Sequence, residues 1–181
     1  MKFFRLLLLL FLAFQTQSEQ LKNILFVGNS YLYYNNSVHN YVEPMLREHH
    51  ESEIETKLSA IGGSKLHHHN IDHLLNPKNL NLDQQIDLLI MQGGSTEVVS
   101  EKDQEKFIQT VQQYSAKAQK LGVKTALYMT HAFTEADRRF EPNLIKKISK
   151  TYFAAGKESN SIVIPVGLAY EIAYKERPNI K

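Results

Sequence analysis

Five short strand-like segments, four of them apolar, alternate with segments of helical periodicity and constrain the fold of this chain more than any other feature. Continuous apolar runs of this length are typical of strands that are covered on both faces, as in a parallel sheet. One of the five segments alternates apolar and polar residues and also predicts a strand. The expected strands are residues 24–27, 53–60, 86–91, 123–129 and 162–165.

The segments between these strands have the apolar spacing of amphipathic helices. Ser100 provides an N-cap for the longest of them, and Pro142 suits the first turn of the next. The expected helices are residues 38–46, 65–75, 101–121 and 141–155, with a further helix that starts at 168. Regular alternation of strand and helix predicts an α/β fold, a three-layer α/β/α sandwich with a five-stranded, mostly parallel sheet.

The first residues of the chain have the pattern of an export signal. A basic start precedes an apolar run over residues 6–14, which is shorter than the roughly 20 residues that span a bilayer. We expect residues 1–18 to be a signal peptide, cleaved after Ser18, and residues 19–181 to form one domain that is secreted or periplasmic. A buried N-terminal helix or a retained anchor is the alternative.

Composition excludes several classes of function. The 21 basic and 19 acidic residues give a net charge of +2 without a basic stripe, so we expect no nucleic-acid partner and no membrane contact after signal cleavage. The sequence has no cysteine, which excludes disulfides, thiol nucleophiles and cysteine-based zinc sites. We expect no cofactor and no metal, and the oligomeric state stays open.

The candidate chemistry lies in the turn that follows the first strand. In this turn Gly28 and Asn29 precede Ser30, and helix-like sequence follows. Ligands of open α/β sheets bind at the carboxyl ends of the strands, where this turn places the Ser30 hydroxyl. A serine in this position is a candidate nucleophile.

Small and polar residues also follow the other strands. Gly62 and Gly63 follow the second strand, Gln92 to Ser95 follow the third, and His131 follows the fourth. One glycine-rich turn would be weak support for a site. Several such turns at successive strand ends predict a ligand site at one edge of the sheet.

These segments resemble those of the SGNH (GDSL-like) hydrolase superfamily, in particular its periplasmic Gly-Asn-Ser-Tyr branch. The resemblance covers the chain from residue 24 to its end. Residues 24–31 resemble the first block of that family, residues 62–64 the second and residues 87–95 the third. Residues 127–131 and 165–169 resemble later framework segments. The resemblance implies a flavodoxin-like SGNH hydrolase fold and an exported serine esterase that acts on small-molecule or carbohydrate esters, commonly acylated carbohydrates.

The same resemblance implies roles for individual residues. Ser30 is the expected nucleophile, and the amides of Ser30 and Gly63 are expected to hold the oxyanion. The family usually has an asparagine side chain in the third block. The aligned position here is Gly94, and Gln92 and Ser95 are nearby polar groups that could substitute for it. Asn29 and His131 complete the expected substrate-binding residues, His131 as a base or a substrate contact.

The resemblance also implies a histidine base in an Asp-x-x-His-Pro segment, which follows the fifth strand and its helix. The sequence stops at residues 178–181, where that segment should begin. We therefore expect a C-terminally truncated domain, which could be inactive as an esterase. The alternative function is a non-catalytic glycan-binding module on the same fold.

Two further clusters allow other interpretations. His69 and His73 are four residues apart and would share one face of a helix, a geometry that can hold a metal; a solvated polar face is the simpler interpretation. His67 and His68 could instead line the substrate cleft. The tyrosines at 31, 33 and 34 suit sugar recognition or cover of the core.

Overall fold

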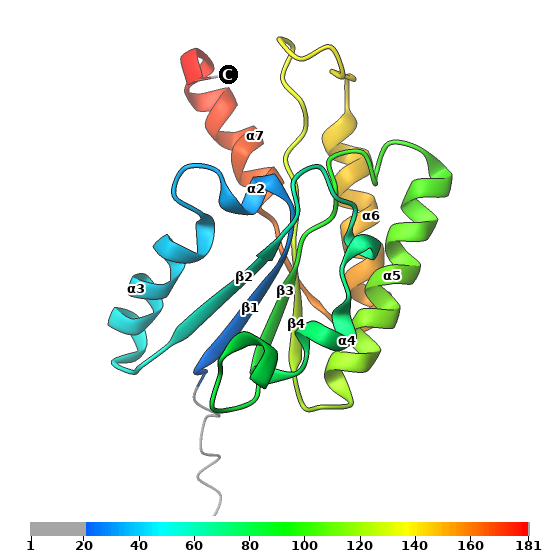
Figure 1. The fold of residues 1–181 in the computed structure, drawn as a ribbon. Coiled ribbons are helices and arrows are strands. Elements are labelled where there is room, and N and C mark those ends of the chain that lie inside the picture. Colours follow the sequence, from blue (N-terminus) through cyan, green and yellow to red (C-terminus); the bar gives the residue numbers. More distant parts are fainter. Residues whose placement is uncertain (1–20, 181) are drawn as a thin grey trace, which may run out of the picture.

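A computed structural model describes residues 21–180 of the chain. The predicted signal peptide, residues 1–18, lies outside these residues. Five parallel strands form one sheet in the order β2-β1-β3-β4-β5. The predicted α/β architecture is confirmed, and the sheet is wholly parallel (Figure 1). The strands are β1 (Asn23–Gly28), β2 (Glu55–Ala60), β3 (Leu88–Met91), β4 (Lys124–Tyr128) and β5 (Ile162–Ile164).

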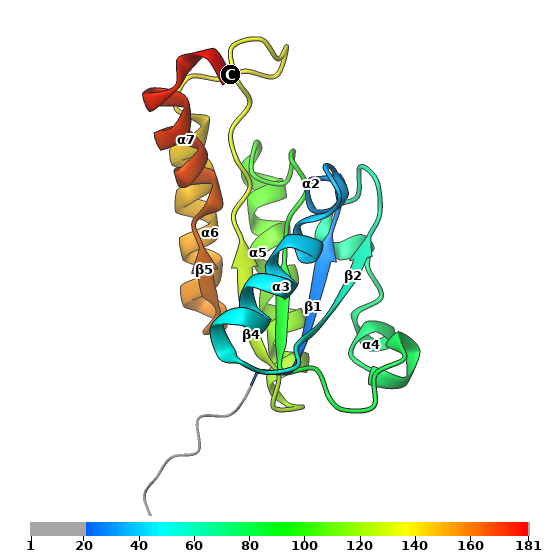
Figure 2. The ribbon, with the colours of Figure 1, turned by 90° about the vertical axis from the view of Figure 1, so that its left-hand side faces the viewer.

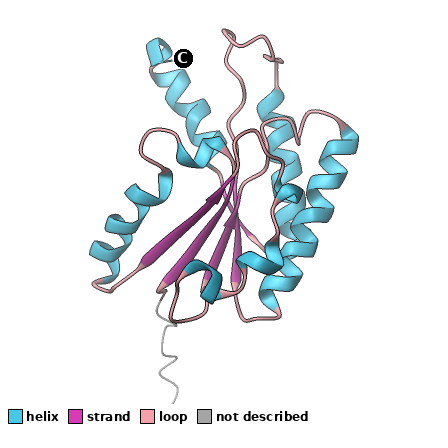
Figure 3. Cartoon of the chain, in the orientation of Figure 1, coloured by secondary structure: helices cyan, strands magenta, loops and turns pink. Residues whose placement is uncertain are grey.

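Helices lie on both faces of this sheet, as Figure 3 shows. The helices α2 (Ser30–Tyr33) and α3 (Val38–His50) lie on one side, and α4 (Ile71–Leu74), α5 (Glu101–Gln119) and α6 (Leu144–Ser159) lie on the other (Figure 1). The last helix is α7 (Val166–Glu176). None of the helices in residues 21–180 is long and apolar enough to cross a membrane.

Alternate residues of the strands enter two apolar clusters, one on each face. Leu25, Leu89 and Leu127 belong to the cluster on the side of α5 and α6, where Phe107 and Tyr152 are fully buried. Ile24, Phe26 and Ile90 belong to the smaller cluster on the side of α2 and α3. Burial on both faces explains why the strands have continuous apolar sequences.

Two of the predicted helices were wrong in part. Residues 65–75 form a 3₁₀ turn (Leu66–His68) and the short α4 instead of one helix. The helical conformation is interrupted at His69, whose side chain turns inward and bonds the carbonyl oxygen of Gly28. The side chain of Asn70 then caps α4 by accepting a hydrogen bond from the amide of His73. Helix α6 begins at Leu144 instead of 141, because Asn143 adopts a left-handed backbone conformation (φ 66°) directly before it.

Candidate active site at the carboxyl edge of the sheet

Ser30 lies where the sequence places it, at the carboxyl end of β1. Asn29 caps α2, and Ser30 is its first residue, partly exposed. Gly28 allows the turn to pass close to the core, because a Cβ atom at this position would lie 2.5 Å from the Gln92 Oε1 atom and 2.8 Å from the Leu32 Cδ1 atom. Ser30 thus lies partly exposed in a turn whose preceding glycine is packed tightly against the core.

The Asn29 side chain connects three loops at this edge. Its Oδ1 atom accepts a hydrogen bond from the Tyr31 amide at 3.1 Å. Its Nδ2 atom donates to the carbonyl oxygen of Ser64 at 3.1 Å and to that of Gly93 at 3.4 Å. Since Asn29 is buried and all these partners belong to the protein, its side chain fixes the loops around Ser30 and does not face a ligand.

Gln92 lies beneath the turn. Its side chain is fully buried, its Oε1 atom accepts from the Asn29 amide at 3.0 Å, and its amide group donates to the carbonyl oxygen of Gly93. This placement removes Gln92 as a donor to an oxyanion at the surface. The physical reason is that the amide group has partners on both of its polar atoms inside the protein.

Gly94 has a structural partner as well. Its amide donates to the Oε2 atom of Glu97, which also accepts from the amide of Leu66 at 2.9 Å. A Cβ atom at Gly94 would lie 2.8 Å from the carbonyl oxygen of Ser64, so a glycine is needed for the loops after β2 and β3 to touch. Gly94 therefore permits close packing, and its amide is not free to bind a ligand.

Two backbone amides in the turns after β1 and β2 have no protein partner in the described part of the chain. Neither the Ser30 amide nor the Gly63 amide has a hydrogen bond to any other residue in 21–180. Gly63 has a left-handed conformation (φ 69°), with open space around the position of a Cβ atom. The resemblance implies these two donors for the oxyanion, and such amides stabilise an oxyanion when they point at it.

Ser95 is the remaining polar side chain of the third loop. Burial of the Tyr31 phenol raises the pKa of Tyr31, and the nearby Ser95 side chain opposes this shift. Gly93 is held from the opposite side, since its amide donates to the Tyr152 hydroxyl at 3.0 Å. The glycine loop after β3 is thus tied to α2 and to α6.

His131 packs within a row of aromatic side chains. Its ring centroid lies 4.7 Å from that of Tyr31 and 4.7 Å from that of Tyr170, with the His131 and Tyr170 rings stacked at 27°. Tyr170 in turn lies 5.8 Å from Tyr174. Burial lowers the pKa of His131, which favours the neutral form of the imidazole.

His69 was predicted on a solvated helix face, and this is wrong. The side chain is buried, with Nε2 lying 2.9 Å from the carbonyl oxygen of Gly28 and 3.3 Å from the Ser64 hydroxyl. Burial lowers the pKa of His69, which fits a neutral ring that donates to Gly28. Within residues 21–180 no three His, Asp or Glu side chains are grouped to hold a metal ion.

Two residues that matter at this edge were not found from the sequence. Glu97 is 1% exposed and joins the loops after β2 and β3 through its two amide partners. Tyr170 belongs to α7 and stacks on His131. No local pattern marks Glu97, which stands between Thr96 and Val98, and none marks Tyr170, whose partner is 39 positions earlier in the sequence.

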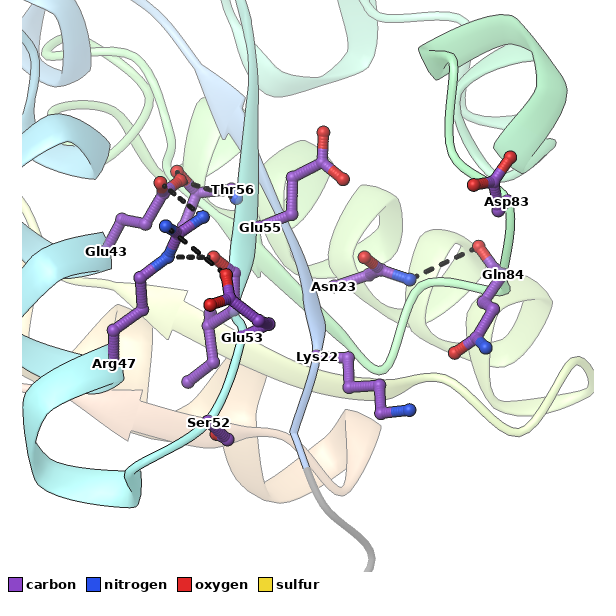
Figure 4. Close-up of a pocket in the computed structure, with 11 residues that line it drawn as sticks. Lys22, Asn23, Glu43, Arg47, Ser52, Glu53, Glu55, Thr56, Asp83 and Gln84 are labelled. Carbon is purple, nitrogen blue, oxygen red and sulfur yellow. Dashed lines mark hydrogen bonds and ion pairs between the residues drawn. The ribbon is translucent and has the colours of Figure 1, made fainter.

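A cavity of about 690 Å³ lies at the opposite edge of the sheet. Charged and polar side chains from β1, β2, α3 and the segment before β3 surround it (Figure 4). Several of these groups bond each other: Glu43 accepts from Thr56 at 2.7 Å and pairs with Arg47 at 3.1 Å. This cavity borders the amino ends of the strands and does not include any of the predicted site residues.

The fold is that of the SGNH hydrolases. One similar solved structure is AlinE4, an SGNH-hydrolase family esterase (TM-score 0.65, 15% identity, covering 90% of this chain and 83% of that one). A second is the acetyl xylan esterase AlAXEase (TM-score 0.62, 22% identity, covering 87% of this chain and 84% of that one). A third is TesA (TM-score 0.60, 17% identity, covering 80% of this chain and 78% of that one). No protein-family model matches the sequence, and no curated protein matches it. At these identities the likeness shows the fold, and the activity must be argued from the site.

Proposed function

We propose that this protein is an exported serine esterase that acts on acylated carbohydrates, with Ser30 as the nucleophile. The observation that carries the proposal is the partly exposed Ser30 at the end of β1, together with amides of Ser30 and Gly63 that have no hydrogen-bond partner in residues 21–180. The solved structures that share the fold include esterases, one of them described as an acetyl xylan esterase.

The chemistry follows from this arrangement. The Ser30 oxygen attacks the ester carbonyl carbon while its proton passes to a base, and the negative charge that forms on the carbonyl oxygen is held by the two amides. Collapse of this intermediate releases the alcohol, which takes up the proton. Water then attacks the acyl-serine in the same way and frees the acid. Each oxyanion donor is worth roughly a hundred- to a thousandfold in rate.

Two histidines contact the Ser30 turn, and they differ in their ability to act as this base. The Nε2 atom of His69 is buried against Gly28, so it has no access to a substrate. His131 borders Tyr31 and has no side-chain hydrogen bond within residues 21–180. His131 is therefore the candidate base within the printed sequence, and the histidine implied by the family resemblance is the alternative.

Labelling with a fluorophosphonate probe tests the nucleophile. We expect one label per chain, which is lost in Ser30→Ala and kept in Ser52→Ala, a serine that lines the cavity at the far edge. Because a general base contributes about 10²–10⁴ in rate, a drop of that size in His131→Gln would assign the base to His131. A protein that reacts equally well without Ser30, or not at all, would contradict the proposal.

The aromatic row beside Ser30 favours a second candidate, a glycan-binding module without turnover. It predicts that saccharides bind equally well to the protein and to Ser30→Ala, and that p-nitrophenyl acetate is hydrolysed no faster than in buffer. Hydrolysis well above the buffer rate that disappears in Ser30→Ala would exclude this candidate.

A further inference from the structure

A pocket of about 240 Å³ lies between α7 and the loop that joins β4 to α6. These two segments rise beyond the carboxyl edge of the sheet, next to each other in both views (Figures 1 and 2). They meet closely at Gly167, whose amide donates to the carbonyl oxygen of Met129 at 3.2 Å. The pocket is therefore on the same side of the molecule as Ser30.

A continuous row of rings connects the pocket with the nucleophile turn. The row begins at Tyr31, which follows Ser30 directly, and passes through His131 and Tyr170 to Tyr174. Tyr174 is also one of the residues that line the pocket. All four residues are at least partly exposed, so a ligand that lies on this row extends from the pocket to the turn that holds Ser30.

The pocket combines aromatic rings with charged groups. The buried residues Ala132 and Phe133 line it, and the guanidinium carbon of Arg139 lies 3.9 Å from the centre of the Phe133 ring. The other lining residues are Thr134, Glu135, Phe140, Glu171, Tyr174 and Lys175. Aromatic faces beside hydrogen-bond acceptors suit polyhydroxylated rings, whose C–H faces pack on aromatics while hydroxyls donate to carboxylates.

Size and charge narrow the ligand further. The pocket is smaller than the roughly 300–1,000 Å³ that hold a drug-sized molecule, so it fits one ring of a larger ligand. Glu135 and Glu171 outnumber Lys175 among the charged lining residues, and the neighbouring Arg139 is paired with Asp137, so the net negative charge repels carboxylates. The charged side chains around the pocket also disfavour a long acyl chain, because these side chains would lose hydration without gaining hydrogen-bond partners.

We propose that this pocket and the aromatic row form a subsite for a neutral oligosaccharide, and that the subsite discriminates against uronic-acid sugars. The inference rests on the proposed function, since it assigns the row to the carbohydrate part of an ester whose acyl group lies at Ser30. It adds a substrate class, a neutral glycan, and the residues that select it, Tyr174 and Glu171.

Binding can be measured without turnover in the Ser30→Ala protein. We would titrate it with xylotetraose, cellotetraose and mannotetraose, and with tetragalacturonate as the anionic probe, by isothermal calorimetry and amide chemical shifts. At least one neutral tetrasaccharide should bind with Kd below about 10 mM, and tetragalacturonate at least about fivefold more weakly. Adding Tyr174→Ala should raise the Kd of the neutral tetrasaccharide at least about fivefold, because an aromatic face is lost.

Two further variants make the result specific. Tyr41→Ala removes an exposed tyrosine from α3, far from the pocket residues in sequence and on another element, and should leave binding unchanged. Glu171→Lys reverses one charge at the pocket. This variant should bind tetragalacturonate more tightly, relative to the neutral sugar, than the parent does. This variant also tests the proposal if Tyr174→Ala does not fold.

The outcomes separate this subsite from the proposed activity. Loss of binding in Tyr174→Ala without any fluorophosphonate label on the parent protein would keep the subsite and overturn the esterase. A labelled Ser30 in a protein that binds none of the neutral sugars below about 10 mM would overturn the subsite alone. An equal loss of saccharide binding in Tyr41→Ala and Tyr174→Ala would also overturn the subsite. Tighter binding of tetragalacturonate than of neutral sugars would do the same.

Discussion

Replacing Glu97 should loosen the site more than any exposed substitution near it. The Glu97 carboxylate accepts from the Leu66 amide at 2.9 Å and from the Gly94 amide, and all three residues are buried. Glu97→Ala leaves two buried donors without a partner, each at a cost of about 1–3 kcal/mol. Release of a buried carboxylate offsets part of this cost, so we expect a net loss of about 2–4 kcal/mol in the free energy of unfolding.

A series of variants distinguishes charge from hydrogen bonding. Glu97→Gln keeps an acceptor oxygen and loses the charge, so it should cost about half as much as Glu97→Ala, because charge-assisted bonds are about twice as strong as neutral ones. Glu105→Ala, an exposed glutamate on α5, should change stability by less than about 0.5 kcal/mol.

Urea denaturation followed by circular dichroism measures these differences, and the rate of fluorophosphonate labelling reports on the loops around Ser30. We expect Glu97→Ala to label more slowly than Glu105→Ala, because the loop after β3 loses one of its ties to the loop after β2. If Glu97→Ala and Glu105→Ala were equally stable, the assignment of Glu97 as the link between these loops would be refuted.

Three more predictions concern the same edge of the sheet. Asn29→Ala should destabilise the protein by about 1–3 kcal/mol and slow labelling of Ser30, since it leaves Tyr31 N–H without its side-chain acceptor; an unchanged labelling rate would contradict the linking role of Asn29. Gly28→Ala should cost about 1–3 kcal/mol, because its Cβ would meet Gln92 and Leu32; a melting temperature equal to that of the parent would contradict this. Because burial lowers the folded-state pKa of His69 below its unfolded value, its contribution to stability is complete at pH 7 and is lost as the pH falls through that lowered pKa; urea titrations at pH 7.5, 6 and 5 should show a shallower fall for His69→Gln than for the parent, and parallel curves would refute this.

The strands and the location of the site could be predicted because both depend on local features. Runs such as Ile24 to Val27 are apolar throughout because both faces of the sheet are covered, and parallel strands all end at the edge where the turns gather. The displayed Ser30 and the open amide of Gly63 follow from the same local pattern.

The partners of buried polar side chains could not be predicted in this way. Gln92 and His69 have residue types that suit a ligand site, but their hydrogen bonds run to Asn29 and Gly28, which lie 63 and 41 positions earlier in the sequence. Glu97 is a similar case, since its carboxylate binds amides from two loops that come together only in the folded protein. Pairings across such separations depend on the packed fold, which periodicity and turn chemistry do not encode.

The close approach at Gly167 has a mechanical consequence for recognition. A Cβ atom at this residue would lie 2.1 Å from the carbonyl oxygen of Thr130, so the first turn of α7 rests against backbone at the end of β4. His131 belongs to that strand end and Tyr170 to that helix, so the seam fixes the spacing of their stacked rings. A single methyl group at Gly167 would push α7 away from the end of β4 and would shift Tyr170 relative to His131.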